Sequence, residues 1–386
     1  MRSATGSWRA ILRAELPQVA RIVVAAAVAW EAALLLGATQ PPIFAALVPL
    51  VSLRDNPFSA FDLSVAPSSS AASHATAAAT TMRATCGSSA RRIARHDPVA
   101  LVTGRSCSVS GMPRTGHAPV NGLQMYYEIH GEEHGGVPVL LLNGAYMTTA
   151  DFGPLLPGLA ASRQVIVVDP QGHGRTADVD RPLTYEGMAD DAAALLGHLG
   201  VAQADVVGYS MGGCAAIQVA IRHPELVRTL VPISAGFRSD AMQPELLAMI
   251  PTITPEMFVG SPFETTYQAV APHPERFPAL VTKLKQLDET PFAWAEDDIR
   301  GITAPTLIIT GDADASVVEH AVAMFRLLGG GRMGDVHGIG HARLAVLPGT
   351  AHFMPPGIGM LDRAEWLLAL IPPFHDAPED VPAPTF

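Results

Sequence analysis

One serine stands between two glycines at the point where an apolar run changes into a helical pattern. The stretch GYSMG spans 208–212, after the strand-like run Ala204–Val207 and before a helical pattern that continues to His223. In this context the G-x-S-x-G spacing predicts a sharp strand-to-helix turn, because a side chain at either glycine would collide with neighbouring backbone. The turn would hold the hydroxyl of Ser210 at the end of a sheet, where it can reach a reacting molecule.

A serine hydroxyl becomes a nucleophile only when a neighbouring base removes its proton, and that base needs a group to orient it. Two later strand-like runs end in such groups. The run PTLIIT (305–310) is followed by two aspartates, and the run ARLAVL (342–347) is followed by His352. The chain order of serine, acid and histidine suits the strand ends of one parallel sheet. We therefore expect Ser210 to be a nucleophile and His352 to be its base.

With these motifs the chain resembles the α/β-hydrolase superfamily over about residues 118–375. In that superfamily the acid stands three residues after the glycine that ends its strand, which is Gly311 here. The resemblance implies that Asp314 is the acid of a catalytic triad, with Asp312 as the alternative. It implies no metal and no organic cofactor.

Two further loops carry the resemblance. The segment LNGA (142–145) corresponds to the loop after the third strand, and it implies an oxyanion hole made by the backbone N–H groups of Ala145 and Met211. Many members have histidine where this chain has Asn143. We expect this difference to affect the bracing of the loop, because the donors are main-chain groups. The segment DPQGHGR (169–175) matches the loop after the fourth strand, and its aspartate and histidine are expected to fix turns.

Apolar runs of strand length alternate with helical patterns from about residue 118 onward. The strand-like runs are Leu123–Ile129, Val137–Leu142, Gln164–Val168, Ala204–Val207, Leu230–Ser234, Pro305–Thr310 and Ala342–Leu347. Near-continuous apolar runs are typical of strands that are buried on both faces. The alternation predicts an α/β fold of the α/β-hydrolase type, a mainly parallel sheet with helices on both faces.

The strand signal stops between about 237 and 300. Prolines there separate short helical patterns, which predicts a helical cap inserted between two strands of the sheet. Four apolar residues of this segment either line a pocket for an acyl group or pack as the core of the cap itself, and the sequence leaves both alternatives open. They are Met257, Phe258, Phe263 and Trp294.

The charge and the cysteine content of the chain argue against several classes of binding partner. The 386 residues carry a net charge of −11, and the acidic excess lies in residues 112–386, which hold 15 basic and 31 acidic residues. Nucleic-acid binding needs clustered cations, so we expect no nucleic-acid partner. The cysteines Cys86, Cys107 and Cys214 form neither a disulfide framework nor a metal-binding pattern, which suits a reducing compartment. His337 and His341 have no accompanying cysteine, and we expect no metal there.

The first 111 residues differ from the rest. Residues 1–63 hold two apolar stretches, of which Ile22–Leu36 is shorter than the roughly 20 residues of a spanning helix and carries a glutamate. Their order resembles the opening of aromatic-acid exporter and fusaric-acid-resistance-like membrane proteins, but the other helices of such an exporter are lacking. Residues 64–111 are rich in Ser, Ala and Arg, which predicts a disordered linker. We expect a fused fragment or a mis-assigned start before a hydrolase domain at 112–386.

These observations together predict a serine hydrolase that cleaves a carboxylic ester or lactone through an acyl-enzyme on Ser210. Its expected partner is a small molecule with an apolar acyl part, and its expected location is the cytoplasm, with membrane association through residues 1–63 as an alternative. Perhydrolysis, carbon–carbon bond hydrolysis and thioester hydrolysis use the same triad. A ligand-binding protein that keeps the fold without catalysis is a rival of a different class.

Overall fold

The computed structural model describes residues 112–354, 356–378 and 382 of the chain. The membrane-associated segment expected at 1–63 and the linker expected at 64–111 lie outside the described residues. Within the described part of the chain, none of the helices has the length and apolar character needed to cross a membrane.

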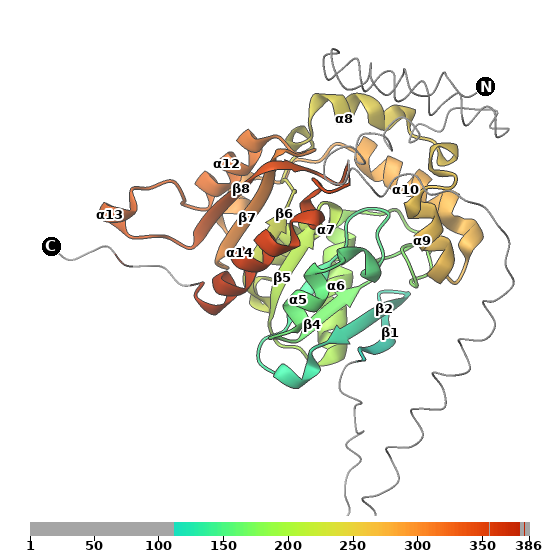
Figure 1. Cartoon of the computed structure of the whole chain (residues 1–386), viewed down its shortest axis with the longest axis horizontal. Coiled ribbons are helices and arrows are strands. Elements are labelled where there is room, and N and C mark those ends of the chain that lie inside the picture. Colours follow the sequence, from blue (N-terminus) through green and yellow to red (C-terminus); the bar gives the residue numbers. More distant parts are fainter. Residues whose placement is uncertain (1–111, 355, 379–381, 383–386) are drawn as a thin grey trace, which may run out of the picture. The chain divides into compact units, whose positions relative to one another are not determined.

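An eight-stranded sheet forms the centre of this part of the chain, in the order β1-β2-β4-β3-β5-β6-β7-β8 (Figure 1). The β1–β2 and β2–β4 pairs are antiparallel and the other pairs are parallel. The predicted mainly parallel sheet is thus confirmed. The strands are β1 (Arg114–Val120), β2 (Leu123–His130), β3 (Val139–Leu142), β4 (Val165–Val168), β5 (Ala204–Tyr209), β6 (Val227–Ile233), β7 (Thr306–Ala313) and β8 (Ala342–Ala351).

The central strands are apolar because both of their faces are covered. Every residue of β3, β4 and β5 is buried, including the runs VLLL and VIVV. In the parallel pairs Leu140 of β3 lies opposite Ile166 of β4 and Val206 of β5. The carboxyl ends of these strands therefore meet at one edge of the sheet, which is where open α/β sheets place their ligand sites.

The sequence analysis did not predict β1, which is an edge strand with several exposed residues. It pairs with β2 through the two-residue turn Asn121–Gly122, whose φ angles are 47° and 83°. Such a turn requires positive φ at both positions, and Asn-Gly is the pair that adopts it most readily. The Asn-Gly pair was therefore the available signal, because the alternation of apolar residues in β1 is weak.

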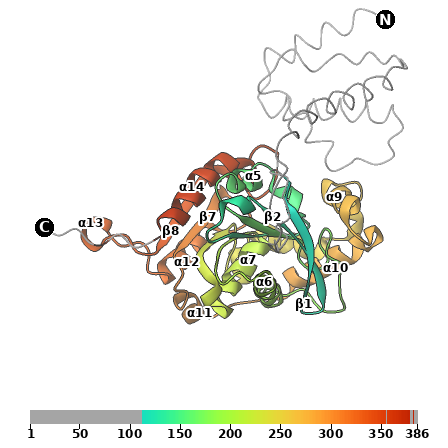
Figure 2. The same ribbon diagram turned by 90° about the horizontal axis from the view of Figure 1, so that it is seen from below.

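Helices cover both faces of the sheet, as Figure 2 shows. On one face, α5 (Leu155–Ala160) and α14 (Ala364–Asp376) bury Leu159 and Ile371 against the central strands. On the other face lie α6 (Tyr185–Leu199), α7 (Met211–Arg222) and α12 (Val318–Leu327), whose apolar side chains join a second core cluster. The short helix α13 (Gly334–His337) lies between α12 and β8.

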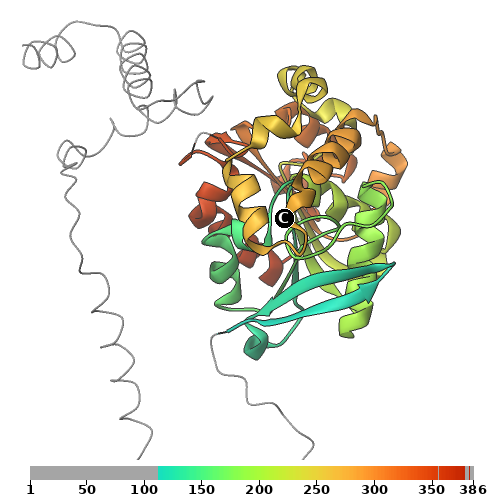
Figure 3. The same cartoon turned by 90° about the vertical axis from the view of Figure 1, so that its right-hand side faces the viewer.

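A helical insertion separates β6 from β7, within the range of about 237–300 that the sequence indicated. It contains α8 (Pro244–Met249), α9 (Pro262–Val270), α10 (Phe277–Glu289) and α11 (Glu296–Arg300). Figure 3 shows its gold and orange helices grouped together, away from the teal β1–β2 hairpin. Phe277 and Leu284 of α10 belong to the same core cluster as Cys214 of α7, so the insertion packs directly on the sheet-covering layer.

Candidate active site

Ser210 occupies the turn between β5 and α7 in a strained conformation, with φ 56° and ψ −119°. Two glycines make this turn possible. A Cβ atom at Gly208 would lie 2.0 Å from the carbonyl oxygen of Gly212, and one at Gly212 would lie 2.3 Å from the carbonyl oxygen of Leu142. The Ser210 N–H donates to the carbonyl oxygen of Ile233, 2.8 Å away, which ties the turn to the end of β6.

The structure brings Ser210, His352 and Asp314 into one hydrogen-bonded line. Ser210 Oγ lies 2.8 Å from His352 Nε2, and His352 Nδ1 lies 2.7 Å from Asp314 Oδ1. An imidazole that donates from Nδ1 to the carboxylate leaves Nε2 free to accept the serine proton. The His352 side chain is 18% exposed and the Asp314 side chain 0%, so a substrate can reach the histidine but not the acid.

Asp314 lies just after β7, in a site that stabilises its charge. Its carboxylate accepts hydrogen bonds from Ser234 Oγ and from the Gly311 N–H at 3.1 Å, in addition to the contact with His352. Burial acts to raise the pKa of Asp314, but the hydrogen bonds from His352, Ser234 and Gly311 outweigh it and hold the pKa below its usual value. The carboxylate is therefore ionised at neutral pH.

Asp312, the alternative acid, occupies a different position. It lies on an exposed part of β7, and its carboxylate accepts a hydrogen bond from the Thr350 N–H at 3.1 Å. That bond ties β7 to the end of β8, two residues before His352. Of the two aspartates that the sequence offered, Asp314 is the one that lies against the imidazole.

Two residues that contact this line were missed by the sequence analysis. The Tyr209 hydroxyl donates to the carbonyl oxygen of His352 at 2.8 Å, and its ring stacks on the imidazole with 5.1 Å between centroids. Ser234, the donor to Asp314, directly follows β6 and has a φ of 54°. Their positions at strand ends beside Ser210 and Asp314 were the only signal in the sequence.

The two main-chain groups expected to form an oxyanion hole lie on neighbouring loops. Met211 is the first residue of α7, so its N–H has no partner within the helix. Ala145 follows β3, whose last residue, Leu142, lies opposite Gly208 of β5. This register sets the loop of Ala145 beside the turn of Ser210.

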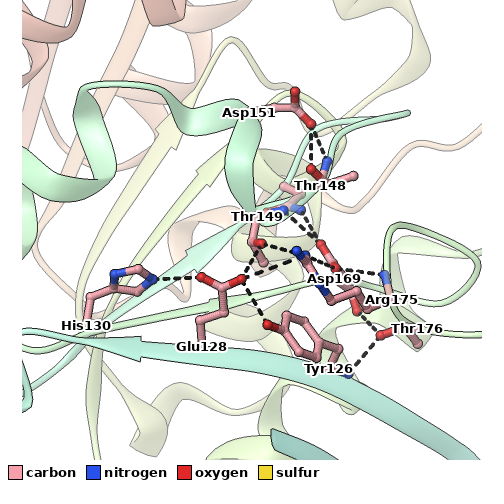
Figure 4. A network of polar contacts seen from close by, with 10 residues as sticks. Tyr126, Glu128, His130, Thr148, Thr149, Asp151, Asp169, Arg175 and Thr176 are labelled. Atoms are coloured by element: carbon pink, nitrogen blue, oxygen red, sulfur yellow. Dashed lines mark hydrogen bonds and ion pairs between the residues drawn. The ribbon is translucent and has the colours of Figure 1, made fainter. Parts of the chain in front are cut away.

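Asp169, at the end of β4, connects the loop after β3 with the loop after β4 (Figure 4). Its carboxylate accepts the N–H groups of Thr149 at 2.8 Å and Arg175 at 2.9 Å, and the Asn143 amide donates to it at 3.4 Å. Burial raises the pKa of Asp169 to about 6 in spite of these hydrogen bonds. Asn143 thus takes part in bracing the loop that carries Ala145.

Glu128 on β2 extends this network, as Figure 4 shows. It accepts hydrogen bonds from the hydroxyls of Thr149 at 2.8 Å and Tyr126 at 3.1 Å, and it lies 2.8 Å from His130 Nε2. The hydrogen bond with His130, joined by those from the two hydroxyls, lowers the pKa of Glu128 to about 2. The segment that follows Ala145 is therefore anchored through Thr149 to side chains of two other segments, Glu128 of β2 and Asp169 after β4.

Aromatic side chains of the insertion form a wall beside this site. The ring of Tyr146, next to Ala145, has its centroid 4.8 Å from that of Phe258 and 5.6 Å from that of Phe263. Phe263 in turn lies 5.6 Å from Phe353, the neighbour of His352. A row of aromatic rings therefore runs from the loop of Ala145 to the neighbour of His352.

The four apolar residues singled out in the insertion have different surroundings. Phe258 and Phe263 belong to the wall just described. Trp294 lies 5.9 Å from the ring of Tyr185, and Met257 is 44% exposed. The two phenylalanines are thus the members of this set that lie beside Tyr146.

His337 and His341 lie on the segment that connects α12 to β8, where His337 Nδ1 is 2.9 Å from the Arg332 guanidinium. In the part of the chain that the structure describes, no group of three or more His, Cys, Asp and Glu side chains is arranged to hold a metal ion.

Residues 139–370 match the alpha/beta hydrolase family. A protein named carbamate hydrolase RutD from Azorhizobium caulinodans is 28% identical over 258 residues, covering 62% of this chain and 96% of that protein. A protein of the same name from Stutzerimonas stutzeri is 27% identical over 212 residues, covering 50% of this chain and 80% of that protein.

Solved structures share the fold. The chain superimposes on E-2-(acetamidomethylene)succinate hydrolase with a TM-score of 0.52 and 20% identity, covering 69% of this chain and 100% of that one. The chain superimposes on a meta-cleavage product hydrolase from Pseudomonas fluorescens IP01 with a TM-score of 0.51 and 21% identity. The match covers 67% of this chain and 97% of that one. The enol-lactonase from Burkholderia xenovorans LB400 superimposes with a TM-score of 0.50 and 20% identity, and the match covers 67% of this chain and 98% of that one. At these identities the likeness concerns the fold.

Proposed function

The chain belongs to the alpha/beta hydrolase family, and we propose that it is a serine hydrolase that cleaves a carboxylic ester or a lactone. The observation that carries this proposal is the line of contacts from Ser210 Oγ through His352 to Asp314, at 2.8 and 2.7 Å. In this reading Ser210 is the nucleophile, His352 the general base and Asp314 the group that orients the imidazole. The strained φ of Ser210 supports it, because strain of this kind clusters at functional sites.

The first half of the reaction forms an acyl-enzyme. His352 Nε2 takes the proton of Ser210 while Oγ attacks the carbonyl carbon of the substrate, and the carbonyl electron pair moves onto its oxygen. The N–H groups of Ala145 and Met211 stabilise that oxyanion, an effect of about 2.7–4 kcal/mol per donor in related chemistry. The intermediate then collapses, the bond to the alcohol oxygen breaks, and His352 donates the proton to the leaving alcohol.

The second half returns the enzyme to its starting state. A water molecule takes the place of the alcohol, and His352 accepts its proton as the water attacks the acyl carbon. Collapse releases the carboxylic acid, and the proton on His352 returns to Ser210 Oγ. Asp314 stays ionised throughout, which its lowered pKa favours, and it stabilises the imidazolium in each half.

The surroundings of the site support an apolar acyl group. We propose that the insertion at about 237–300 acts as a cap, because its Phe258 and Phe263 contact Tyr146 beside the oxyanion loop. An aromatic wall removes water from the acyl chain and strengthens the electrostatic interactions near the reacting carbonyl. The site residues themselves supply every proton transfer, so the mechanism needs no metal or organic cofactor.

The names of two relatives favour carbamate hydrolysis as a second candidate. The matches with the two proteins named carbamate hydrolase span 96% and 80% of the length of those proteins. A carbamate carbonyl is open to the same attack by Ser210: the bond to the alcohol oxygen breaks, the alcohol leaves, and water then releases a carbamic acid, which loses CO2 to give the amine. Esters and carbamates of the same alcohol, offered side by side, separate the two candidates.

The test is hydrolysis by the full-length chain of p-nitrophenyl esters of graded acyl length, of lactones and of matched carbamates. We expect turnover of at least one series, an acyl adduct on the protein by mass spectrometry, and a loss of at least about ten-thousand-fold in kcat for Ser210→Ala. The melting temperature of the variant serves as the control for folding. If no member of the panel is hydrolysed, or if Ser210→Ala retains full activity, the proposal is wrong.

A further inference from the structure

The chain contains two lysines among its 25 lysine and arginine residues, and both lie on α10 of the insertion. The ammonium group of Lys283 extends from the insertion to the 178–181 segment, which lies between β4 and α6. It donates to Asp178 Oδ1 at 2.8 Å and to the carbonyl oxygens of Val179 at 2.7 Å and Arg181 at 2.9 Å. An ammonium group has three N–H donors, so each of them has an acceptor here.

The 178–181 segment is held in place by contacts that do not involve the insertion. Gln171 Nε2 donates to the same oxygen of Asp178 at 2.8 Å and to the carbonyl oxygen of Arg181 at 3.1 Å. The Arg181 guanidinium in turn pairs with the buried carboxylate of Asp191 on α6. The oxygens that accept from Lys283 therefore belong to a fixed part of the sheet and its covering helices.

The second lysine makes a different kind of contact. Lys285 Nζ donates to the carbonyl oxygens of Pro251 at 2.7 Å and Ile253 at 3.2 Å, both of which lie in the insertion itself. It also lies 3.8 Å from the carboxylate of Glu289, whose side chain is 41% exposed. Lys285 thus joins two parts of the insertion, whereas Lys283 joins the insertion to the rest of the domain.

The helix that carries Lys283 also supports the aromatic wall. Phe277, the first residue of α10, has its ring centroid 6.1 Å from that of Phe258. Phe258 in turn lies 4.8 Å from Tyr146, the neighbour of Ala145. A shift of α10 would therefore move the aromatic ring that faces the loop of Ala145.

Apolar packing and hydrogen bonding constrain α10 in different ways. The inward face of the helix is buried and apolar, with Leu280, Val281, Leu284 and Leu287. Apolar burial is not directional, so it attaches the helix without fixing its exact position. Hydrogen bonds weaken steeply with distance and angle, and those of a charged donor are about twice as strong as neutral ones. The contacts of Lys283 are therefore the ones that can fix where α10 lies against the 178–181 segment.

We propose that Lys283 is a positioning residue, which fixes where the insertion places Phe258 and Phe263 and so sets the length of acyl group that the hydrolase accepts. The inference rests on the proposed hydrolase function and concerns the specificity of the same site. Lys283 acts through α10 and not on the reacting atoms. A long acyl group that packs on the aromatic wall should depend on this contact, whereas an acetyl group should not.

The test is steady-state hydrolysis of p-nitrophenyl acetate and p-nitrophenyl hexanoate by the full-length chain. Lys283→Met removes the ammonium group and keeps a long side chain, and Lys285→Met is the matched control on the same helix. In Lys283→Met we expect KM for the hexanoate to rise about fivefold relative to KM for the acetate, with kcat for the acetate within about twofold of the wild type. In Lys285→Met the ratio of the two KM values should change less than about twofold.

A ratio of KM values that is unchanged in Lys283→Met would overturn the inference, and so would an equal change in Lys285→Met. If Lys283→Met does not fold, Asp178→Asn replaces it, because this variant removes the negative charge beside Lys283 with little change of shape. It should move the ratio in the same direction by about twofold, and an unchanged ratio there would overturn the inference.

Hydrogen exchange measured by mass spectrometry gives a second readout that needs no substrate. The backbone amides of α9, which carries Phe263, should exchange faster in Lys283→Met than in the wild type or in Lys285→Met. Intact ester hydrolysis with unchanged exchange in α9 would reject this inference alone. An absence of all hydrolysis would reject the proposed function, together with the choice of acyl length that rests on it.

Discussion

Two carboxyl groups, the buried Asp314 at the edge of the sheet and the half-buried Asp288 on the inserted helix α10, have opposite environments. Asp314 has hydrogen bonds from His352, Ser234 and the Gly311 N–H, and its pKa lies below the usual value. Asp288 has no partner among the described residues, and burial raises its pKa to about 7. The same side chain is thus stabilised as an anion in one region and left without a partner in the other.

This difference shows that the sheet edge and the insertion hold their polar groups in different ways. The sheet edge is preorganised, because strand ends hold each polar group against a fixed partner before any substrate arrives. The insertion keeps a carboxyl group that folding alone does not stabilise. The sheet edge therefore accounts for the proposed chemistry, and the insertion contributes the aromatic side chains beside it.

The largest effect is expected from the acid at the sheet edge. Asp314→Asn should lower kcat by about ten-thousand-fold, because an amide there no longer holds the imidazole in the tautomer that accepts the serine proton. Asp312→Asn, two residues away on the exposed part of β7, is the matched control and should change kcat less than about threefold. Steady-state hydrolysis of a p-nitrophenyl ester measures both. Comparable losses in the two variants would contradict the assignment of Asp314.

A smaller effect is expected from Tyr209, which positions His352 through its backbone. Tyr209→Phe keeps the ring stacked on the imidazole and removes the hydrogen bond to the His352 carbonyl oxygen. Such a bond contributes about 1 kcal/mol, so kcat should fall by about fivefold with KM unchanged. A rise in KM with kcat unchanged would show that Tyr209 acts on substrate binding instead.

The smallest effect is on stability and comes from Asp288. Its folded-state pKa of about 7 lies above the unfolded value of roughly 3.9, so the folded state holds the proton more tightly between these pH values. The wild type therefore loses stability as the pH rises through this window, and Asp288→Asn does not. The variant should match the wild type near pH 4 and exceed it by about 1 kcal/mol near pH 8.

Urea denaturation of both proteins at the two pH values measures this difference. Asp169, with a pKa of about 6, titrates in both proteins, so its contribution cancels in the comparison. Glu289→Gln serves as the control, because its exposed carboxylate should produce no pH-dependent gain. A variant that is less stable than the wild type at the higher pH would show that Asp288 has a stabilising partner.

Much of the fold could be predicted from the sequence, because the signal is local. The runs VLLL and VIVV are apolar on both faces, and the alternation with helical patterns fixes a parallel sheet. GYSMG is equally local, since its two glycines are needed for a single turn. The edge strand β1 has no such pattern, and it was missed although its Asn121–Gly122 turn is a hairpin signal.

The candidate site was predictable only where a residue ends a strand. Ser210, Asp314 and His352 follow β5, β7 and β8, so chain order alone brings them to one edge, and the structure places them within hydrogen-bonding distance. Ser234 could not be singled out, because its hydrogen bond to Asp314 exists only where the end of β6 lies beside the end of β7. Asp288 stands in a helical pattern beside Glu289, and only the packing of α10 distinguishes the half-buried carboxyl from the exposed one.

The most direct test of the central claim is labelling of the full-length chain with a fluorophosphonate, which reacts with an activated serine whatever the natural substrate. The proposed mechanism predicts one adduct per chain, located at Ser210 by peptide mass spectrometry and lost in both Ser210→Ala and His352→Ala. A folded wild-type protein that takes up no label, or takes it up at another serine, would contradict the proposal that Ser210 is the nucleophile of a hydrolase.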